Sequence, residues 1–198
     1  MRWMGLDLSL TGTGIVVLDE DGTVRATARD GWKLDRSASV IDKIDRLVHI
    51  ASTIMALVRE HGPGPDALTV GIEGYAYSQG FGGGALADLG ELGGIVKTQL
   101  WLGVQNAPRI VAVTTARARV FANGHLKKKM VQPLLAERGI VFGDPDIADA
   151  YVIAEALRLQ HQTEATDGEG SDGGAGRRAR GARQGGGRRG RRPARGAA

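Results

Sequence analysis

The chain opens with an apolar pattern that predicts short strands joined by tight turns. Residues 2–9 and 13–19 are mostly bulky and apolar, and Thr and Gly lie between them. Apolar runs of this length bounded by Gly-rich turns are typical of neighbouring strands in a hairpin. Asp21-Gly22 is a strong signal for a second hairpin turn. Residues 23–32 are therefore predicted as a third antiparallel strand.

Apolar residues at helical spacing then predict a helix over residues 37–61, which ends at a Gly- and Pro-rich segment. A short apolar strand is predicted at 67–75. A glycine-rich loop at 78–84 and a helix over 85–102 follow.

The last part of the pattern predicts a fifth strand at 109–115 and helices over 115–122, 126–138 and 145–161. This order of elements predicts an α/β fold, a five-stranded mixed sheet flanked by helices.

Two of these apolar strands each carry one acid, Asp7 and Glu73. Both strands are expected to be central in the sheet, and a buried carboxylate is costly unless something compensates it. A hydrogen-bonded structural aspartate is one interpretation. An acid held on a rigid strand to bind a metal ion or a phosphate is the other.

A third acidic feature begins the last predicted helix. Asp144 before Pro145 is typical of a helix start, an N-cap followed by proline, so Asp144 is interpreted as mainly structural. Asp146 and Asp149 lie three residues apart and share one helix face. By themselves they are also compatible with a solvated acidic first turn.

Asp7, Glu73, Asp146 and Asp149 form a stronger signal together than separately. They have no obvious basic partners in the sequence, and carboxylate oxygens are ligands that Mg²⁺ and Mn²⁺ prefer. Two such ions about 3.5–4 Å apart can clamp an in-line phosphoryl displacement. The four acids therefore indicate a site for hard divalent cations.

The order of five motifs resembles the RuvC-type Holliday-junction resolvases of the RNase H-like nuclease superfamily. The motifs are GLDLSLTGTG, IEGYAY, LGELGGIV, GHLKKKMVQ and DPDIADAYVIA, and they span about residues 3–160. The resemblance implies an RNase H-like five-stranded sheet and a homodimer. It also implies Mg²⁺-dependent cleavage of branched DNA, especially four-way junctions, with two ions per active site and Mn²⁺ as a substitute.

Carried over by position, the metal-binding acids of the family fall on Asp7, Glu73, Asp146 and Asp149. The catalytic lysine falls on Lys128. These five residues are therefore the expected catalytic set.

DNA contacts are expected nearby, because an acidic site needs cations to hold a polyanion. Lys127, Lys128 and Lys129 are the main candidates, although charge runs are often only a solvated face, and Arg117 is a weaker one. Tyr75 or Tyr77 is the candidate for the aromatic residue that props the junction open.

The helix over residues 85–102 contains three glycines within five residues. Each costs up to about 1 kcal/mol of helix stability against alanine, which favours a role in close packing against a neighbouring helix or a second subunit. We expect this helix to form the homodimer interface. The candidate contacts are Leu86, Leu89, Gly93 and Val96.

Charge divides the chain into two parts. The segment from residue 173 to the end holds nine arginines and no acid, whereas the preceding part is net acidic. Residues 1–161 are predicted to be the nuclease domain. Residues 162–198 are predicted to be an acidic linker and a disordered Gly/Arg-rich C-terminal tail, since they lack core-forming side chains. The tail is not part of the family core and suggests a viral or otherwise divergent member.

Other properties narrow the class of protein. The sequence has no cysteine, which excludes disulfides, thiolate zinc sites and a cysteine nucleophile. It has no apolar run of membrane-spanning length and no signal-peptide pattern. A cytoplasmic protein without membrane partners is expected, in a bacterial cell or a phage-infected host.

Two other functions are compatible with parts of the sequence. GLDLSLTGTG also resembles the first phosphate loop of actin-like ATPases and sugar kinases, but those proteins need two such domains and a second glycine-rich loop. A non-enzymatic nucleic-acid-binding adaptor would explain the arginines and leave the four carboxylates unexplained.

Overall fold

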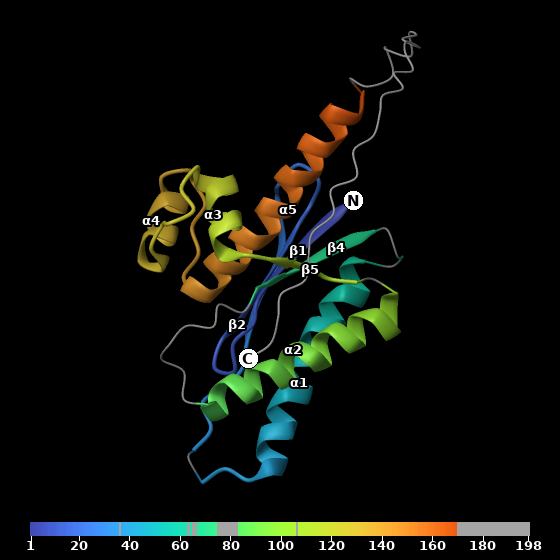
Figure 1. The fold of residues 1–198 in the computed structure, drawn as a ribbon, viewed down its shortest axis with the longest axis vertical. Coiled ribbons are helices and arrows are strands. Elements are labelled where there is room, and N and C mark those ends of the chain that lie inside the picture. The colour runs from blue at the N-terminus through green and yellow to red at the C-terminus, as the bar shows by residue number, and fades with distance from the viewer. Residues whose placement is uncertain (36, 63, 65–66, 75–82, 106, 170–198) are drawn as a thin grey trace, which may run out of the picture.

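The computed structural model describes residues 1–35, 37–62, 64, 67–74, 83–105 and 107–169 (Figure 1). Its centre is a five-stranded sheet in the order β3-β2-β1-β4-β5. β1 is antiparallel to β2 and parallel to β4, so the sheet is mixed, as the sequence predicted. The strands are β1 (Arg2–Asp7), β2 (Thr13–Leu18), β3 (Val24–Asp30), β4 (Leu68–Glu73) and β5 (Arg109–Val111).

Helices cover both faces of the sheet. α1 and α2 pack together over one face, while α5 crosses the other with α3 and α4 beside it (Figure 1). The helical elements are α1 (Val40–His61), α2 (Gly83–Val104), α3 (Val113–Phe121), the 3-10 turn η1 (Lys128–Met130), α4 (Val131–Ala136) and α5 (Pro145–Glu169). None of the helices in the described part of the chain has the length and apolar content to cross a bilayer.

The alternation of side chains along β1 determines which face receives Asp7. Met4 and Leu6 are fully buried in the core under α1 and α2. Trp3 belongs to the second core, which α5 completes. Because successive side chains of a strand point to opposite faces, Asp7 lies with Trp3 on the α5 side.

Strand β4 repeats this arrangement. Val70 and Ile72 belong to the core under α1 and α2. A Cβ added to Gly71 would contact the side chains of Leu157 and Ile153 on α5. Glu73, two residues further on, therefore also lies on the α5 side.

Glycines let α5 lie close against the sheet. A Cβ at Gly5 would collide with the backbone of α5 at Ala150 and Ala154. A Cβ at Gly14, which pairs with Asp7 in the sheet, would collide with the backbone of Asp146. At these two positions no side chain separates the sheet from α5, and this brings the first turns of α5 next to the end of β1.

The structure corrects two of the predicted elements. The strand expected at 109–115 ends at Val111, and α3 begins at Val113. The single helix expected over 126–138 is instead η1 followed by α4. Pro133 explains the break, because a proline inside a helix clashes with the carbonyl four residues earlier, here that of Lys129.

The boundaries of two other helices also differ from the sequence prediction. α1 begins at Val40, three residues later than expected, because Ser39 and Asp42 form a reciprocal capping box. α5 continues to Glu169, so the first residues of the expected linker are helical. Residues 170–198 lie outside the described residues, and the disorder expected for the tail stays a prediction.

Candidate active site

The end of β1 and the start of α5 form the framework of the site. Asp7 is the last residue of β1. The Oδ1 atom of Asp144 accepts a hydrogen bond of 2.8 Å from the backbone N–H of Asp146, which is the N-cap expected ahead of Pro145. This cap fixes where the helix begins, and the three-residue spacing then directs Asp146 and Asp149 to the same side.

Lys128 lies at the point where three of these acids converge. Its Nζ atom is 3.4 Å from Asp7 Oδ2, 3.2 Å from Asp146 Oδ1 and 2.9 Å from Asp149 Oδ2. Asp7 and Asp149 are buried, whereas 53% of the Lys128 side chain is exposed. The structure thus brings together four of the five residues expected to be catalytic around one ammonium group.

Glu73 completes the cluster from β4. It shares a side-chain hydrogen bond with Asp7. Burial, this hydrogen bond and the charges of Asp7 and Asp149 raise the pKa of Glu73 to about 8. Without another cation in the site, Glu73 therefore holds a proton at neutral pH and donates it in the hydrogen bond to Asp7.

Burial also raises the pKa of Asp7, against the opposing effects of the Glu73 hydrogen bond and the Lys128 charge. Burial by itself would lower the pKa of Lys128, but its hydrogen bond to Asp149 and the charges of Asp7 and Asp149 raise it overall. Lys128 is therefore cationic at neutral pH. It compensates the buried carboxylates, which would otherwise be costly.

No basic partners for the acids were evident in the sequence, but the structure brings three to them. Besides Lys128, Arg117 donates from Nη2 to Asp149 Oδ1 at 3.3 Å and from Nη1 to the Leu126 carbonyl at 2.7 Å. Its side chain is only 15% exposed. Arg117 therefore faces the carboxylates and ties the segment before Lys128 to α5, and the DNA contact expected of it stays a prediction.

Arg29 on β3 is a third basic partner of the acids, and it was not expected from the sequence. Its Nε atom lies 2.9 Å from Asp144 Oδ2 and 3.6 Å from Asp146 Oδ2. No motif marks this residue. Only the pairing of β3 with β2 places it beside the start of α5.

The other predicted DNA contacts have different outcomes. Lys127 and Lys129 are exposed and flank Lys128, which agrees with a surface available to DNA. Tyr75 and Tyr77 lie outside the described residues, so the aromatic wedge stays a prediction.

The interface predicted on α2 needs correction. Val96 is 1% exposed and Gly93 is buried, so both face the protein's own core. Gly90 and Gly94 have no described atom within 4 Å of an added Cβ, so they do not serve close packing within the described chain. The correction concerns Gly93 and Val96, whereas Leu86 and Leu89 are half-buried and their role in an interface stays a prediction.

The carboxylate oxygens of the four acids are chemically suitable ligands for a hard divalent cation. Four carboxylates meet here, and three of them already surround one cationic nitrogen. In the arrangement described, no three acidic or histidine side chains among the described residues are placed to coordinate one ion. Binding of a metal ion between these acids therefore requires the Lys128 ammonium to move aside.

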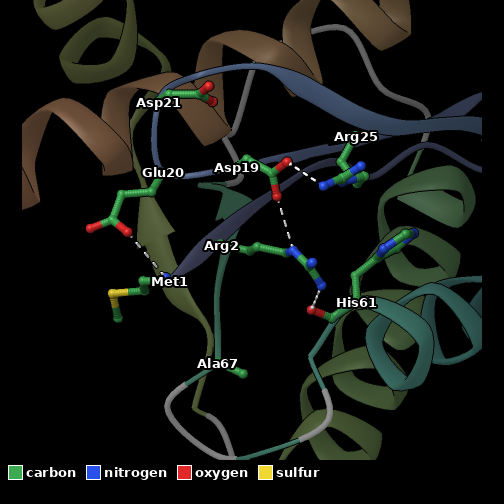
Figure 2. A pocket seen from close by; sticks show the side chains of 8 residues that line it. All are labelled: Met1, Arg2, Asp19, Glu20, Asp21, Arg25, His61 and Ala67. Atoms are coloured by element: carbon green, nitrogen blue, oxygen red, sulfur yellow. Dashed lines mark hydrogen bonds and ion pairs between the residues drawn. The ribbon is translucent and has the colours of Figure 1, made fainter.

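A separate pocket of about 510 Å³ lies at the other end of β1, beside Met1 and Arg2 (Figure 2). Two of its arginines share one carboxylate: Asp19 binds Arg2 at 3.0 Å and Arg25 at 2.9 Å. From Arg2 to Asp7 the strand spans about 16 Å, so this pocket is not part of the carboxylate cluster.

Comparison with solved structures identifies the fold. The structure of RuvC from Thermus thermophilus superposes with a TM-score of 0.65 at 16% identity, over 83% of this chain and 97% of that chain. The T. thermophilus RuvC complex with a Holliday junction substrate gives 0.65 at 13% identity, over 82% and 96%. The yeast mitochondrial Holliday junction resolvase Ydc2 gives 0.55 at 14% identity, over 84% and 81%.

The sequence itself matches no protein-family model, and no curated protein matches it either. The structural likenesses establish that the chain has the RNase H-like fold found in RuvC. The resemblance suggested by the five sequence motifs is thereby confirmed at the level of the fold.

Proposed function

We propose that this protein is a metal-dependent endonuclease that cleaves four-way DNA junctions and other branched DNA. The observation that carries the proposal is the convergence of Asp7, Glu73, Asp146 and Asp149 around Lys128 on a RuvC-like fold. The reaction is hydrolysis: one water molecule is consumed, one P–O bond of the backbone breaks, and a phosphate monoester and an alcohol result.

The four carboxylates are the proposed ligands of Mg²⁺ or Mn²⁺, with two ions per active site. When bound, these ions would supply a nucleophilic hydroxide and Lewis-acid stabilisation of the leaving oxygen. Glu73 must give up its proton to become a ligand, so its raised pKa favours the metal-bound form at higher pH. Lys128, once it leaves the carboxylates, is the proposed contact to the phosphate of the strand being cut.

The protein is also proposed to act as a homodimer, because paired incisions in a nearly two-fold symmetric junction need two sites related by a two-fold axis. The first half of α1 exposes four aliphatic side chains, Val40, Ile41, Ile44 and Val48, and α2 exposes Trp101 and Leu102. Such surfaces are unusual on a monomer. Light scattering at micromolar concentration should give twice the chain mass, and a monomer mass would contradict this part of the proposal.

Cleavage of labelled four-way, forked, flapped and linear duplex DNA with Mg²⁺ tests the activity. Asp7→Asn should abolish cleavage and leave junction binding largely intact, because it removes a ligand charge and keeps the shape of the side chain. Asp21→Asn is the matched control, since Asp21 lies in the exposed β2–β3 turn, where it accepts a hydrogen bond from Thr23. Near-normal cleavage by Asp7→Asn would refute the assignment of the site.

A further inference from the structure

Arg29 joins three segments that surround the carboxylates. From β3, its Nε atom reaches Asp144 Oδ2 at 2.9 Å, and its Nη2 atom donates to the Thr11 carbonyl at 3.0 Å. The same Nε atom lies 3.6 Å from Asp146 Oδ2. One guanidinium group therefore connects the β1–β2 turn, β3 and the start of α5.

The sequence of the β1–β2 turn leaves room for this contact. A Cβ at Gly12 would collide with both Arg29 Nη2 and Asp146 Oδ2. Any other residue at this position would push the guanidinium and the carboxylate apart. The absence of a side chain at residue 12 is thus what allows Arg29 to approach Asp146.

The two oxygens of Asp146 face different cations. Oδ1 points to Lys128 at 3.2 Å, inside the cluster. Oδ2 faces Arg29, which is held on the outer side by Asp144. When a metal ion replaces Lys128 between the acids, Arg29 is able to stay in place, because its anchors at Asp144 and Thr11 take no part in the cluster.

We infer that Arg29 is a positioning residue that holds Asp146 in the orientation needed to bind the metal ion. This inference rests on the proposed metal-dependent function. It assigns Asp144 a second role besides capping α5, because Oδ1 of Asp144 caps the helix while Oδ2 anchors Arg29.

The direction of the change in Mn²⁺ affinity distinguishes the positioning role of Arg29 from a simple effect of its charge. If only charge mattered, removing a cation near the acids would strengthen metal binding, as we expect for Lys128. Arg29 is already paired with Asp144 and its side chain is 42% exposed, so its net repulsion of a metal ion is weak. Loss of its bracing contacts should dominate, and metal binding should weaken.

Calorimetric titration of the full-length chain with Mn²⁺, without DNA, tests the inference. Arg29→Gln should weaken Mn²⁺ binding by about tenfold, which is typical for loss of a residue that orients a metal ligand. Arg29→Lys should not restore the Mn²⁺ affinity, because one ammonium group cannot hold both Asp144 and the Thr11 carbonyl as the planar guanidinium group does. Unchanged or tighter binding by Arg29→Gln, or full rescue by lysine, would overturn the inference.

Arg25→Gln is the matched control. Arg25 lies on the same strand, is 53% exposed and is ion-paired with Asp19, but it lines the separate pocket at the far end of β1 (Figure 2). Its loss should leave Mn²⁺ binding unchanged. An equal weakening in this control would show a general effect of altering β3 and would overturn the role of Arg29.

Asp144→Asn gives a second, independent variant. Asparagine still caps the helix, but its amide replaces the carboxylate that anchors Arg29. Mn²⁺ binding should again weaken, and unchanged binding would count against the bracing role. If the unaltered protein binds no Mn²⁺, the proposed function fails together with the inference. If it binds Mn²⁺ and Arg29→Gln binds equally well, only the inference fails.

Discussion

Replacing Lys128 by methionine should strengthen metal binding and at the same time reduce cleavage. The ammonium group lies within 3.4 Å of three carboxylates, at the position that the proposed function assigns to a metal ion. Methionine keeps a similar length and removes the charge. The competing cation would then be absent, and the acids would accept a metal ion without first releasing Lys128.

The size of the effect follows from the exposure of the side chain. Because 53% of Lys128 is exposed, water screens its ion pairs. Each such pair contributes about 0.2–1 kcal/mol, so three of them together give about 1–2 kcal/mol. A free energy of about 1.4 kcal/mol corresponds to a factor of ten, so Mn²⁺ affinity should rise about 5- to 30-fold.

Two measurements on the same protein check this prediction. Calorimetry gives the Mn²⁺ affinity, and cleavage of a labelled four-way junction at saturating Mg²⁺ gives the rate. Loss of a preorganised cation near the reacting phosphate should lower the rate by about 10²–10³. Lys129→Met is the control for the Mn²⁺ affinity only, because Lys129 is exposed, no partner is found for it in the described chain, and it is itself a candidate DNA contact. If Lys128→Met binds Mn²⁺ no more tightly than the unaltered protein, the idea that Lys128 competes with the metal ion is wrong.

Three further predictions concern packing, pH and the tail. Gly5→Ala should lower the free energy of unfolding by about 2–3 kcal/mol in a denaturant titration, because its Cβ meets the backbone of α5, whereas Gly143→Ala, with open space around it, should change little. The metal-free protein should lose thermal stability as the pH rises from about 4.5 to about 8, because folded Glu73 keeps a proton that the unfolded chain has already released. Glu73→Gln should remove this dependence of stability on pH, and an unchanged dependence would show that another group causes it. Deleting residues 173–198 should make the salt dependence of DNA binding shallower by about 3–4 units of log K per log salt if four phosphates are contacted, and equal slopes with and without the tail would exclude that role.

Several features of the site follow from short stretches of sequence. Side chains alternate between the two faces of the strand along residues 3–8. Asp7 therefore lies on the opposite face from Met4 and Leu6, which belong to the core under α1 and α2. Asp144-Pro145 predicts the start of α5, and the structure shows the expected cap. These signals are local, because strand period, turn chemistry and capping depend on residues that are neighbours along the chain.

The tertiary structure decided which groups compensate the acids. Lys128 and Asp7 are separated by 121 residues, and neither the order of motifs nor the charge pattern gives the distance between them. Arg29 reaches the cluster only because β3 pairs with β2 and because Gly12 leaves space. Gly5 and Gly14 set how closely α5 approaches the sheet, and this depends on backbone contacts between segments far apart in sequence. The sequence therefore determined which carboxylates are available, while packing across the sheet determined that three basic side chains hold them. The physical reason is that several buried carboxylates are stable together only when cationic groups lie beside them.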